Sequence, residues 1–329
     1  MFDIRRREFI ALLGGASSSC IGWPTAAHAQ QPGRVPRVGY VWIGAPGTDE
    51  NKAGLAQGLE RRGYVIGRTL LLEARYANGN DALVPQLIAE LLALKVDVLA
   101  TPSTPISRAA QRATSSVPIV SMSGDPVGTG LVASLARPGG NITGLSLLSE
   151  YGAKWLELLM EATPKLRRVG VLLNPDNPAA ARQVERMREA ARALALDLTT
   201  LSARPAELEA SLGVIAPTSI DGFVVSDDAF LETILPRLVA LAAERGLPAL
   251  YGFSNAVKLG GLMSYSADFF DLWRKAAGYI DRILKGARPA DLPIEQATKF
   301  SLKINLRTAK ALGVVMPPTL LATADEVIE

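Results

Sequence analysis

Short apolar runs rich in β-branched residues alternate with helical patterns along most of the chain. Four of these runs predict buried strands, at residues 37–43, 70–76, 97–100 and 118–121. Helical spacing of apolar positions separates them, for example over residues 50–62 and in a segment that Asp81 is expected to cap and that ends near Leu94. Regular alternation of strand and helix predicts a parallel sheet with helices on both faces.

The second half of the chain repeats the order of these runs. Three segment pairs match, namely residues 37–42 with 168–173, residues 96–99 with 220–225, and residues 117–121 with 247–251. A single match of this kind carries little weight, because apolar runs resemble one another. Three matches in the same order at nearly constant spacing predict two similar α/β lobes.

Three segments between or after these runs predict crossings from one lobe to the other. They are the turn-rich residues 137–144, residues 260–265 and residues 289–300. We therefore assign residues 35–145 and about 266–292 to the first lobe, and residues 146–265 and about 293–329 to the second. The predicted fold is α/β, with two Rossmann-like lobes whose parallel sheets are joined by three hinge crossovers around a cleft.

The first 29 residues have a different pattern. Three arginines at positions 5–7 precede a modestly apolar stretch, and Ala27-His28-Ala29 has the small-x-small form of a signal-peptidase site. We interpret residues 1–29 as an export signal that directs the chain to the periplasm. Arg6-Arg7-Glu8-Phe9-Ile10 resembles a twin-arginine motif, and the general secretory route is the alternative.

Composition favours binding over catalysis. The 329 residues include one histidine and one cysteine, and both (His28 and Cys20) fall within the predicted signal. The remaining chain therefore has no imidazole base, no thiol nucleophile and no soft metal ligand. It also lacks the glycine-rich motifs of nucleotide sites and the Gly-x-Ser-x-Gly motif of serine hydrolases. We expect no cofactor and no metal.

Charge excludes other partners. The formal net charge is only +3, and the charged residues are interspersed without a basic run, which disfavours nucleic acid and anionic membranes. After the predicted signal, no uncharged apolar stretch reaches the length of a transmembrane helix. The expected partner is a small molecule.

Candidate ligand contacts follow the strands, because ligands of open parallel sheets meet the loops at the carboxyl ends of the strands. In the first lobe these candidates are Trp42, Thr101, Ser103, Thr104, Gly124 and Asp125. Ser103 and Thr104 stand directly before a predicted helix, where hydroxyls and free N–H groups suit a carboxylate, although simple capping is the alternative. Asp125 could accept an ammonium group or form a turn before Pro126.

The second lobe supplies carboxyl and aromatic candidates. They are Asn174, Ser226, Asp227, Tyr251, Phe253, Tyr265 and Ser266. The aromatic rings suit a flat ligand, but rings at strand ends also serve packing. The pair Asp227-Asp228 raises the alternative of acid–base or cation chemistry, against the simpler interpretation that one carboxylate caps a helix near Phe230.

Longer motifs add a family resemblance that spans nearly the whole chain after the predicted signal. Three stretches carry it, namely residues 125–144, residues 304–328 and Ser264-Tyr265-Ser266-Ala267-Asp268. They resemble the ABC-transporter substrate-binding proteins of the tryptophan/tyrosine-binding-like family. The resemblance implies the type I periplasmic binding fold, a membrane permease powered by an ATPase, and pocket positions at Ser103, Thr104, Asp125, Tyr265 and Ser266.

The sequence thus predicts a monomeric periplasmic component of an ABC importer. It would capture a small, amino-acid-like organic ligand, aromatic in the best-understood relatives, by hinge closure between its lobes. One alternative is a two-lobed ligand sensor for a membrane receptor. Another is an exported enzyme that uses the carboxylates of Asp227-Asp228 or Asp125.

Overall fold

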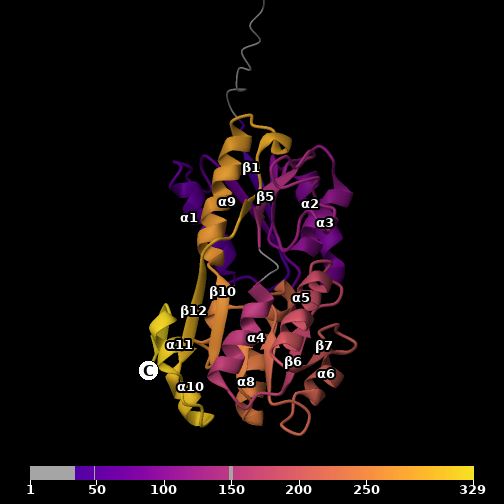
Figure 1. The fold of residues 1–329 in the computed structure, drawn as a ribbon. Coiled ribbons are helices and arrows are strands. Elements are labelled where there is room, and N and C mark those ends of the chain that lie inside the picture. The colour runs from indigo at the N-terminus through magenta and orange to yellow at the C-terminus, as the bar shows by residue number, and fades with distance from the viewer. Residues whose placement is uncertain (1–33, 48, 148–150) are drawn as a thin grey trace, which may run out of the picture. The chain divides into compact units, whose positions relative to one another are not determined.

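The alternating pattern forms two sheets, one mainly from each half of the chain (Figure 1). The computed structural model describes residues 34–47, 49–147 and 151–329. Residues 35–329 form one compact unit. The predicted export signal, with Cys20 and His28, lies outside the described residues.

The first sheet has the order β11-β5-β4-β3-β1-β2, and all its strands are parallel. Its strands are β1 (Arg37–Trp42), β2 (Leu71–Tyr76), β3 (Val98–Thr101), β4 (Ile119–Ser123), β5 (Ile142–Ser146) and β11 (Glu295–Gln296). The helices of this lobe are α1 (Glu50–Glu60), α2 (Val84–Ala93), α3 (Thr104–Ala113) and α9 (Phe269–Leu284). β1, β3, β4 and β5 are almost wholly buried, as expected of parallel strands under two helical layers.

The second sheet has the order β13-β12-β10-β9-β8-β6-β7. Its strands are β6 (Arg168–Leu173), β7 (Asp197–Ser202), β8 (Gly222–Val225), β9 (Ala249–Tyr251), β10 (Met263–Ala267), β12 (Phe300–Asn305) and β13 (Glu326–Ile328). β12 pairs antiparallel with β10, and the other pairs are parallel. The helices of this half are α4 (Tyr151–Ala162), α5 (Ala180–Ala193), α6 (Leu208–Val214), α7 (Ala229–Thr233), α8 (Leu235–Arg245), α10 (Leu306–Ala311) and α11 (Pro318–Thr323).

The two sheets share one topology. The order β5-β4-β3-β1-β2 in the first corresponds strand by strand to β10-β9-β8-β6-β7 in the second. The three sequence matches paired β1 with β6, β3 with β8 and β4 with β9, which are equivalent positions. The predicted two-lobed α/β fold with parallel sheets is therefore confirmed, with β12 as an added antiparallel strand.

The chain crosses between the sheets three times. It leaves the first sheet after β5, returns between β10 and α9, and leaves again between β11 and β12. The turn-rich residues 137–144 and the segment 260–265 that were expected to cross instead run into β5 and β10, so these two crossings lie further along the chain. β5 and β10 continue for as long as they pair with neighbouring strands, and each crossing begins after the last paired residue.

Helix α9 packs closely against α1 because glycines in α1 leave room for its backbone. A Cβ at Gly54 would collide with the Phe270 carbonyl oxygen, and one at Gly58 would lie 2.5 Å from that of Arg274. Figure 1 shows the two helices side by side. The ring of Trp273 on α9 is fully buried beneath this contact, and Trp155 on α4 is fully buried in the other lobe.

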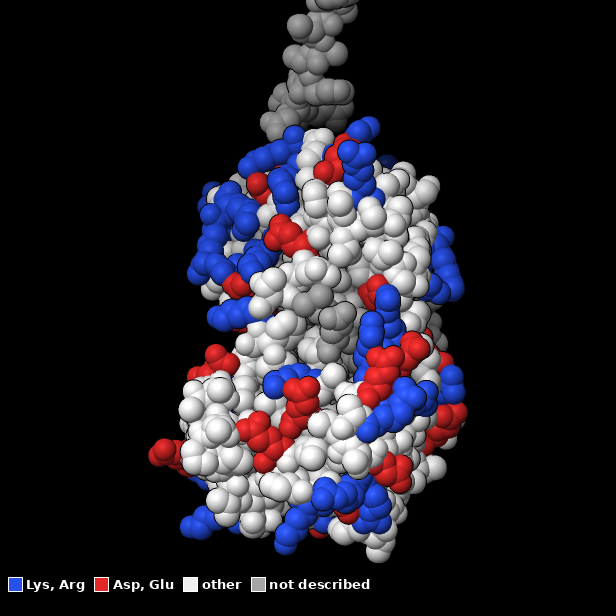
Figure 2. All heavy atoms as spheres, in the orientation of Figure 1, with Lys and Arg blue, Asp and Glu red and all other residues white. Residues whose placement is uncertain are grey.

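Local capping differs from the prediction in one helix. Asp81 was expected to cap a helix that ends near Leu94, but it begins a short 3₁₀ turn (Asp81–Leu83) that Asn80 caps, and α2 starts after that turn. Figure 2 shows acidic and basic side chains intermingled over most of the visible face. Several ion pairs join residues within one turn of a helix, such as Arg186 with Glu189.

Candidate functional site

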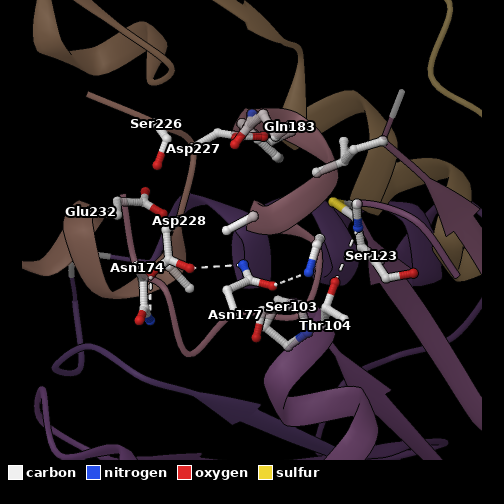
Figure 3. Close-up of a pocket in the computed structure, with 18 of the residues that line it drawn as sticks. Ser103, Thr104, Ser123, Asn174, Asn177, Gln183, Ser226, Asp227, Asp228 and Glu232 are labelled. Atoms are coloured by element: carbon white, nitrogen blue, oxygen red, sulfur yellow. Dashed lines mark hydrogen bonds between the residues drawn. The ribbon is translucent and has the colours of Figure 1, made fainter. Parts of the chain in front are cut away.

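A pocket lies between the carboxyl ends of the strands of the two sheets (Figure 3). The first lobe contributes Trp42 at the end of β1, the start of α3 after β3, and Ser123 with Gly124 at the end of β4. The second lobe contributes the loops that follow β6, β8 and β9. The empty space between these walls is about 730 Å³, a figure that includes the open mouth of the pocket.

Hydroxyl groups and a helix start form the first-lobe wall. Ser103 is the N-cap of α3, and its Oγ accepts a hydrogen bond from the Ile106 N–H at 3.4 Å. Thr104 Oγ1 accepts from the Gly124 N–H at 3.2 Å. Ser123 Oγ is buried and has no hydrogen-bond partner among the described residues. This wall combines a helix dipole with hydroxyl donors, which suits an anionic group.

Asp227 dominates the second-lobe wall. Its two carboxyl oxygens accept hydrogen bonds from the Tyr151 hydroxyl and from Gln183 Nε2, the latter at 3.1 Å. Burial raises the pKa of Asp227 to about 7, with a smaller contribution from the neighbouring Asp228 carboxyl. A cationic group in the pocket would reverse this balance by favouring the ionised carboxylate.

Asp228 is held by the protein itself. It caps α7 through the Phe230 N–H at 2.9 Å, and it accepts from Asn177 Nδ2 at 2.8 Å and from Asn174 Nδ2 at 3.3 Å. Burial raises its pKa, while these donors lower it. The capping interpretation of this pair therefore applies to Asp228, and Asp227 is the carboxyl with remaining acceptor capacity toward the pocket.

Aromatic side chains complete the walls. Trp42 and Phe253 line the pocket and are almost fully buried. Phe269 at the start of α9 and Tyr151 at the start of α4 also line the pocket. Glu232 adds a further carboxyl. None of the described lining residues is lysine, arginine or histidine. The pocket therefore has one acidic wall, one hydroxyl wall and rings between them.

Eight of the sequence-predicted residues line this pocket. They are Trp42, Ser103, Thr104, Gly124, Asn174, Ser226, Asp227 and Phe253. Figure 3 shows Ser103 and Thr104 on the opposite side from Ser226 and Asp227. All eight lie at strand ends, in the loops that follow strands or at helix starts along the carboxyl edge of a sheet, which is the rule that selected them.

Two first-lobe candidates have other partners. Thr101 Oγ1 lies 2.8 Å from Ser107 Oγ, in a buried hydroxyl chain behind the pocket. Asp125 accepts from the Gly128 N–H at 2.8 Å and forms an ion pair with Arg182 of α5 at 2.7 Å. Asp125 thus joins the two lobes at the rim instead of lining the pocket.

Three second-lobe candidates also lie outside the pocket. Tyr251 is fully buried in the core, with its ring 6.4 Å from that of Phe223. The Tyr265 ring stacks on Phe300 at 5.7 Å. Ser266 lines a neighbouring hollow beside the start of α9. Side chains alternate along β9 and β10, so the strand register decides which of these residues reach the cleft.

The sequence reasoning did not select several lining residues. They are Asn51, Ser123, Tyr151, Asn177, Gln183, Glu232 and Phe269. Asn177 and Ser123 lie in or beside loops already selected, so the strand-end rule would have found them. Gln183 lies on the second turn of α5 and Asn51 on the first turn of α1, where the local sequence gives no sign that a side chain faces a ligand.

Two searches of the described residues gave negative results. No helix among residues 34–47, 49–147 and 151–329 is both long and apolar enough to cross a membrane. In the same ranges, no group of three or more histidine, cysteine, aspartate or glutamate side chains is arranged to hold a metal ion.

Comparison with known proteins places this pocket in context. A family model described as ABC transporter substrate binding protein matches residues 40–328. A tyrosine-binding protein of Clostridioides difficile is 28% identical over 271 residues, which cover 82% of this chain and 78% of that protein.

Two solved structures are also similar. The ABC domain of Streptococcus pneumoniae in complex with L-Trp has a TM-score of 0.83 at 26% identity, covering 90% of this chain and 100% of that one. A ligand-free, open structure of a substrate-binding protein with adhesive properties from Clostridium difficile has a TM-score of 0.63 at 25% identity. The match covers 89% of this chain and 99% of that one.

Proposed function

Because this chain belongs to the ABC transporter substrate-binding protein family, whose members are solute-binding proteins, we propose that it captures an aromatic L-amino acid and delivers it to an importer. The observation that carries the proposal is the polarity of the pocket. An acidic wall and a hydroxyl wall face each other, with aromatic rings between them. This arrangement matches the ammonium, carboxylate and ring of such a ligand.

The ammonium group is assigned to Asp227. Its carboxyl faces a pocket whose described lining has no cationic side chain, so a ligand cation would be its only ionic partner there. Buried charges are stable only when paired, and an ammonium group would satisfy both partners. Glu232 and Asp228 add negative potential to the same wall.

The carboxylate is assigned to the start of α3. Ser103 and Thr104 offer hydroxyls there, the helix dipole favours an anion, and the unpartnered Ser123 hydroxyl lies in the same wall. The ring of the ligand would lie among Trp42, Phe253 and Phe269. The tyrosine-binding and L-Trp-bound relatives support an aromatic ligand.

The mechanism proposed is hinge closure. Each assigned ligand group contacts a different lobe, so only closed lobes can make all the contacts, and the ligand shifts the population toward that state. The TM-score is 0.83 against the L-Trp complex and 0.63 against the open, ligand-free relative, although the identities are nearly equal. This difference supports a lobe arrangement close to that of the ligand-bound relative.

The remaining parts of the proposal concern location and partners. The predicted signal at residues 1–29 supports export to the periplasm, where the monomeric closed protein would meet a membrane permease driven by an ATPase. The ligand would leave chemically unchanged, since the pocket offers no described nucleophile–base pair with imidazole or thiol.

A thermal-shift screen of residues 30–329 tests the proposal, since every described helix and strand lies within them. A ligand at 100 times its Kd adds about 2.7 kcal/mol to stability. We therefore expect L-tryptophan, L-tyrosine or L-phenylalanine to raise Tm by several degrees, with smaller shifts for aliphatic amino acids. No shift with any aromatic amino acid would overturn the proposed ligand class.

A further inference from the structure

An aromatic cluster lies at the hinge and connects the three crossovers. Tyr151 begins α4 just after the first crossing, Tyr265 lies in β10 just before the second, and Phe300 begins β12 just after the third. The Phe300 ring lies 5.1 Å from the ring of Tyr151 and 5.7 Å from that of Tyr265. Trp155 joins them edge-on to Tyr151 at 5.1 Å. These four residues are termed the hinge cluster.

The hinge cluster is also tied to the backbone of β10. Trp155 Nε1 donates a hydrogen bond to the Tyr265 carbonyl oxygen at 2.7 Å. This bond fixes α4 against the strand that leads into the second crossing. Aromatic pairs contribute beyond their buried area, so the cluster stabilises the arrangement of the crossovers seen in this structure.

Tyr151 is the member of the hinge cluster that lines the ligand pocket. Its ring packs within the cluster, while its hydroxyl donates to Asp227 Oδ2. One side chain therefore contacts both the hinge and the carboxyl assigned to the ligand's ammonium group.

We propose that Tyr151 is a positioning residue that makes Asp227 selective for an ammonium group and couples that recognition to the hinge. This inference rests on the proposed function, because it concerns the same pocket. Tyr151 fixes one Asp227 oxygen, and Gln183 fixes the other from α5. The carboxyl is thereby held in one orientation before the ligand arrives, which reduces the ordering cost of binding.

The electrostatics of the wall support this role. Asp228 lines the same pocket and opposes ionisation of Asp227, while Arg182 on α5 is paired with Asp125. Donated hydrogen bonds favour the ionised carboxylate. Burial already raises the pKa of Asp227 to about 7, so loss of the Tyr151 donor would raise it further and reduce the charged fraction at neutral pH.

Tyr151→Phe tests the hydroxyl with two ligands that differ only in the ammonium group, L-tryptophan and 3-(indol-3-yl)propionate. A hydrogen bond to a charged group is typically worth about tenfold or more in affinity. We expect the Kd of L-tryptophan to rise by about that factor and the Kd of indolepropionate to change less than about twofold. Tyr265→Phe is the matched control, because it removes a hydroxyl from a cluster ring outside the pocket, and both Kd values should stay near wild type.

The number of protons released on ligand binding is a second measurement. It would not change if the role of Tyr151 were purely structural. Calorimetry of L-tryptophan binding at pH 7 in two buffers of different ionisation enthalpy measures protons released. The wild type should release about half a proton, since Asp227 has a pKa of about 7 and ionises fully against an ammonium group. Tyr151→Phe should release more, toward one proton.

Phe300→Leu tests the ring contacts, because it leaves the Tyr151 hydroxyl but removes the ring between Tyr151 and Tyr265. We expect it to weaken L-tryptophan binding by about threefold more than indolepropionate binding. Equal weakening of both ligands in Tyr151→Phe, with unchanged proton release, would overturn the inference and leave the proposed function standing. If wild-type protein binds none of the aromatic amino acids, the proposed function fails first.

Discussion

The loops after β3 and β8 occupy equivalent places in the two lobes but present opposite chemistry. Ser103 caps α3 in the first lobe, and Asp228 caps α7 in the second. The first loop presents the hydroxyls of Ser103 and Thr104, whereas the second presents the buried carboxyl of Asp227. The two lobes thus share one topology but form pocket walls of different chemistry. This is possible because the residues of one loop can differ without any change in the topology.

Removing the charge of the acidic wall should have the largest effect. In Asp227→Asn, a bound ammonium group would lose its ionic partner, and an unpaired buried charge costs ~3–5 kcal/mol. We expect the Kd of L-tryptophan to rise at least about 100-fold by calorimetry. Asp176→Asn is the control, because Asp176 belongs to the same lobe but pairs with Arg204 outside the pocket. Retained affinity in Asp227→Asn would contradict the assignment of the ammonium group.

The acidic wall should also make the stability of the ligand-free protein depend on pH. The pKa of Asp227 is raised from 3.8 to about 7, chiefly by burial, so the folded state holds a proton that the unfolded state has released. Stability should therefore fall as pH rises from about 4 to about 7, by up to ~1.4 kcal/mol per pH unit.

Denaturant titrations across this pH range measure the slope. Asp227→Asn should flatten the decline and leave the ligand-free variant more stable than wild type at pH 8. A stability that is independent of pH between 4 and 7 in the wild type would show that Asp227 is not protonated in the folded state.

A charge placed in the hydroxyl wall should have a smaller effect. Ser103→Asp preserves an N-cap for α3 but sets a carboxylate where the ligand carboxylate is assigned. We expect Tm of the ligand-free protein to change little and the Kd of L-tryptophan to rise roughly tenfold, as like charges repel. Ser103→Ala, by contrast, removes the N-cap of α3, which should lower the free energy of unfolding by about 0.5–2 kcal/mol. Wild-type affinity in Ser103→Asp would contradict the assignment of the ligand carboxylate to the start of α3.

The rim contact between the lobes should have the smallest effect. Asp125 and Arg182 form an ion pair in which the Arg182 side chain is 54% exposed, and exposed pairs contribute ~0–1 kcal/mol. Asp125→Asn should therefore weaken L-tryptophan binding by less than about fivefold, and added salt should reduce the difference. Affinity measurements at low and high salt check this. A larger loss of affinity that persists in high salt would indicate that Asp125 contacts the ligand in the pocket.

Much of the architecture followed from local sequence. Buried parallel strands are short apolar runs, so β1, β3 and β4 and their counterparts β6, β8 and β9 were visible as a repeat. Strand ends were therefore also predictable, and with them Ser103, Thr104, Ser226 and Asp227. Asp125 and Tyr265 were selected by the same rule, but their side chains turn to Arg182 and Phe300, which lie far away in the chain.

By itself, the sequence determined the two-lobed α/β fold and the loops that meet at the cleft, because hydrophobic periodicity and turn residues act over a few positions. Only the tertiary structure decided which side chains in those loops face the cleft. Tyr151 and Gln183 reach Asp227 from α4 and α5 because helix packing and strand register orient them. Those orientations depend on contacts between segments distant in sequence, for which a local pattern has no signal.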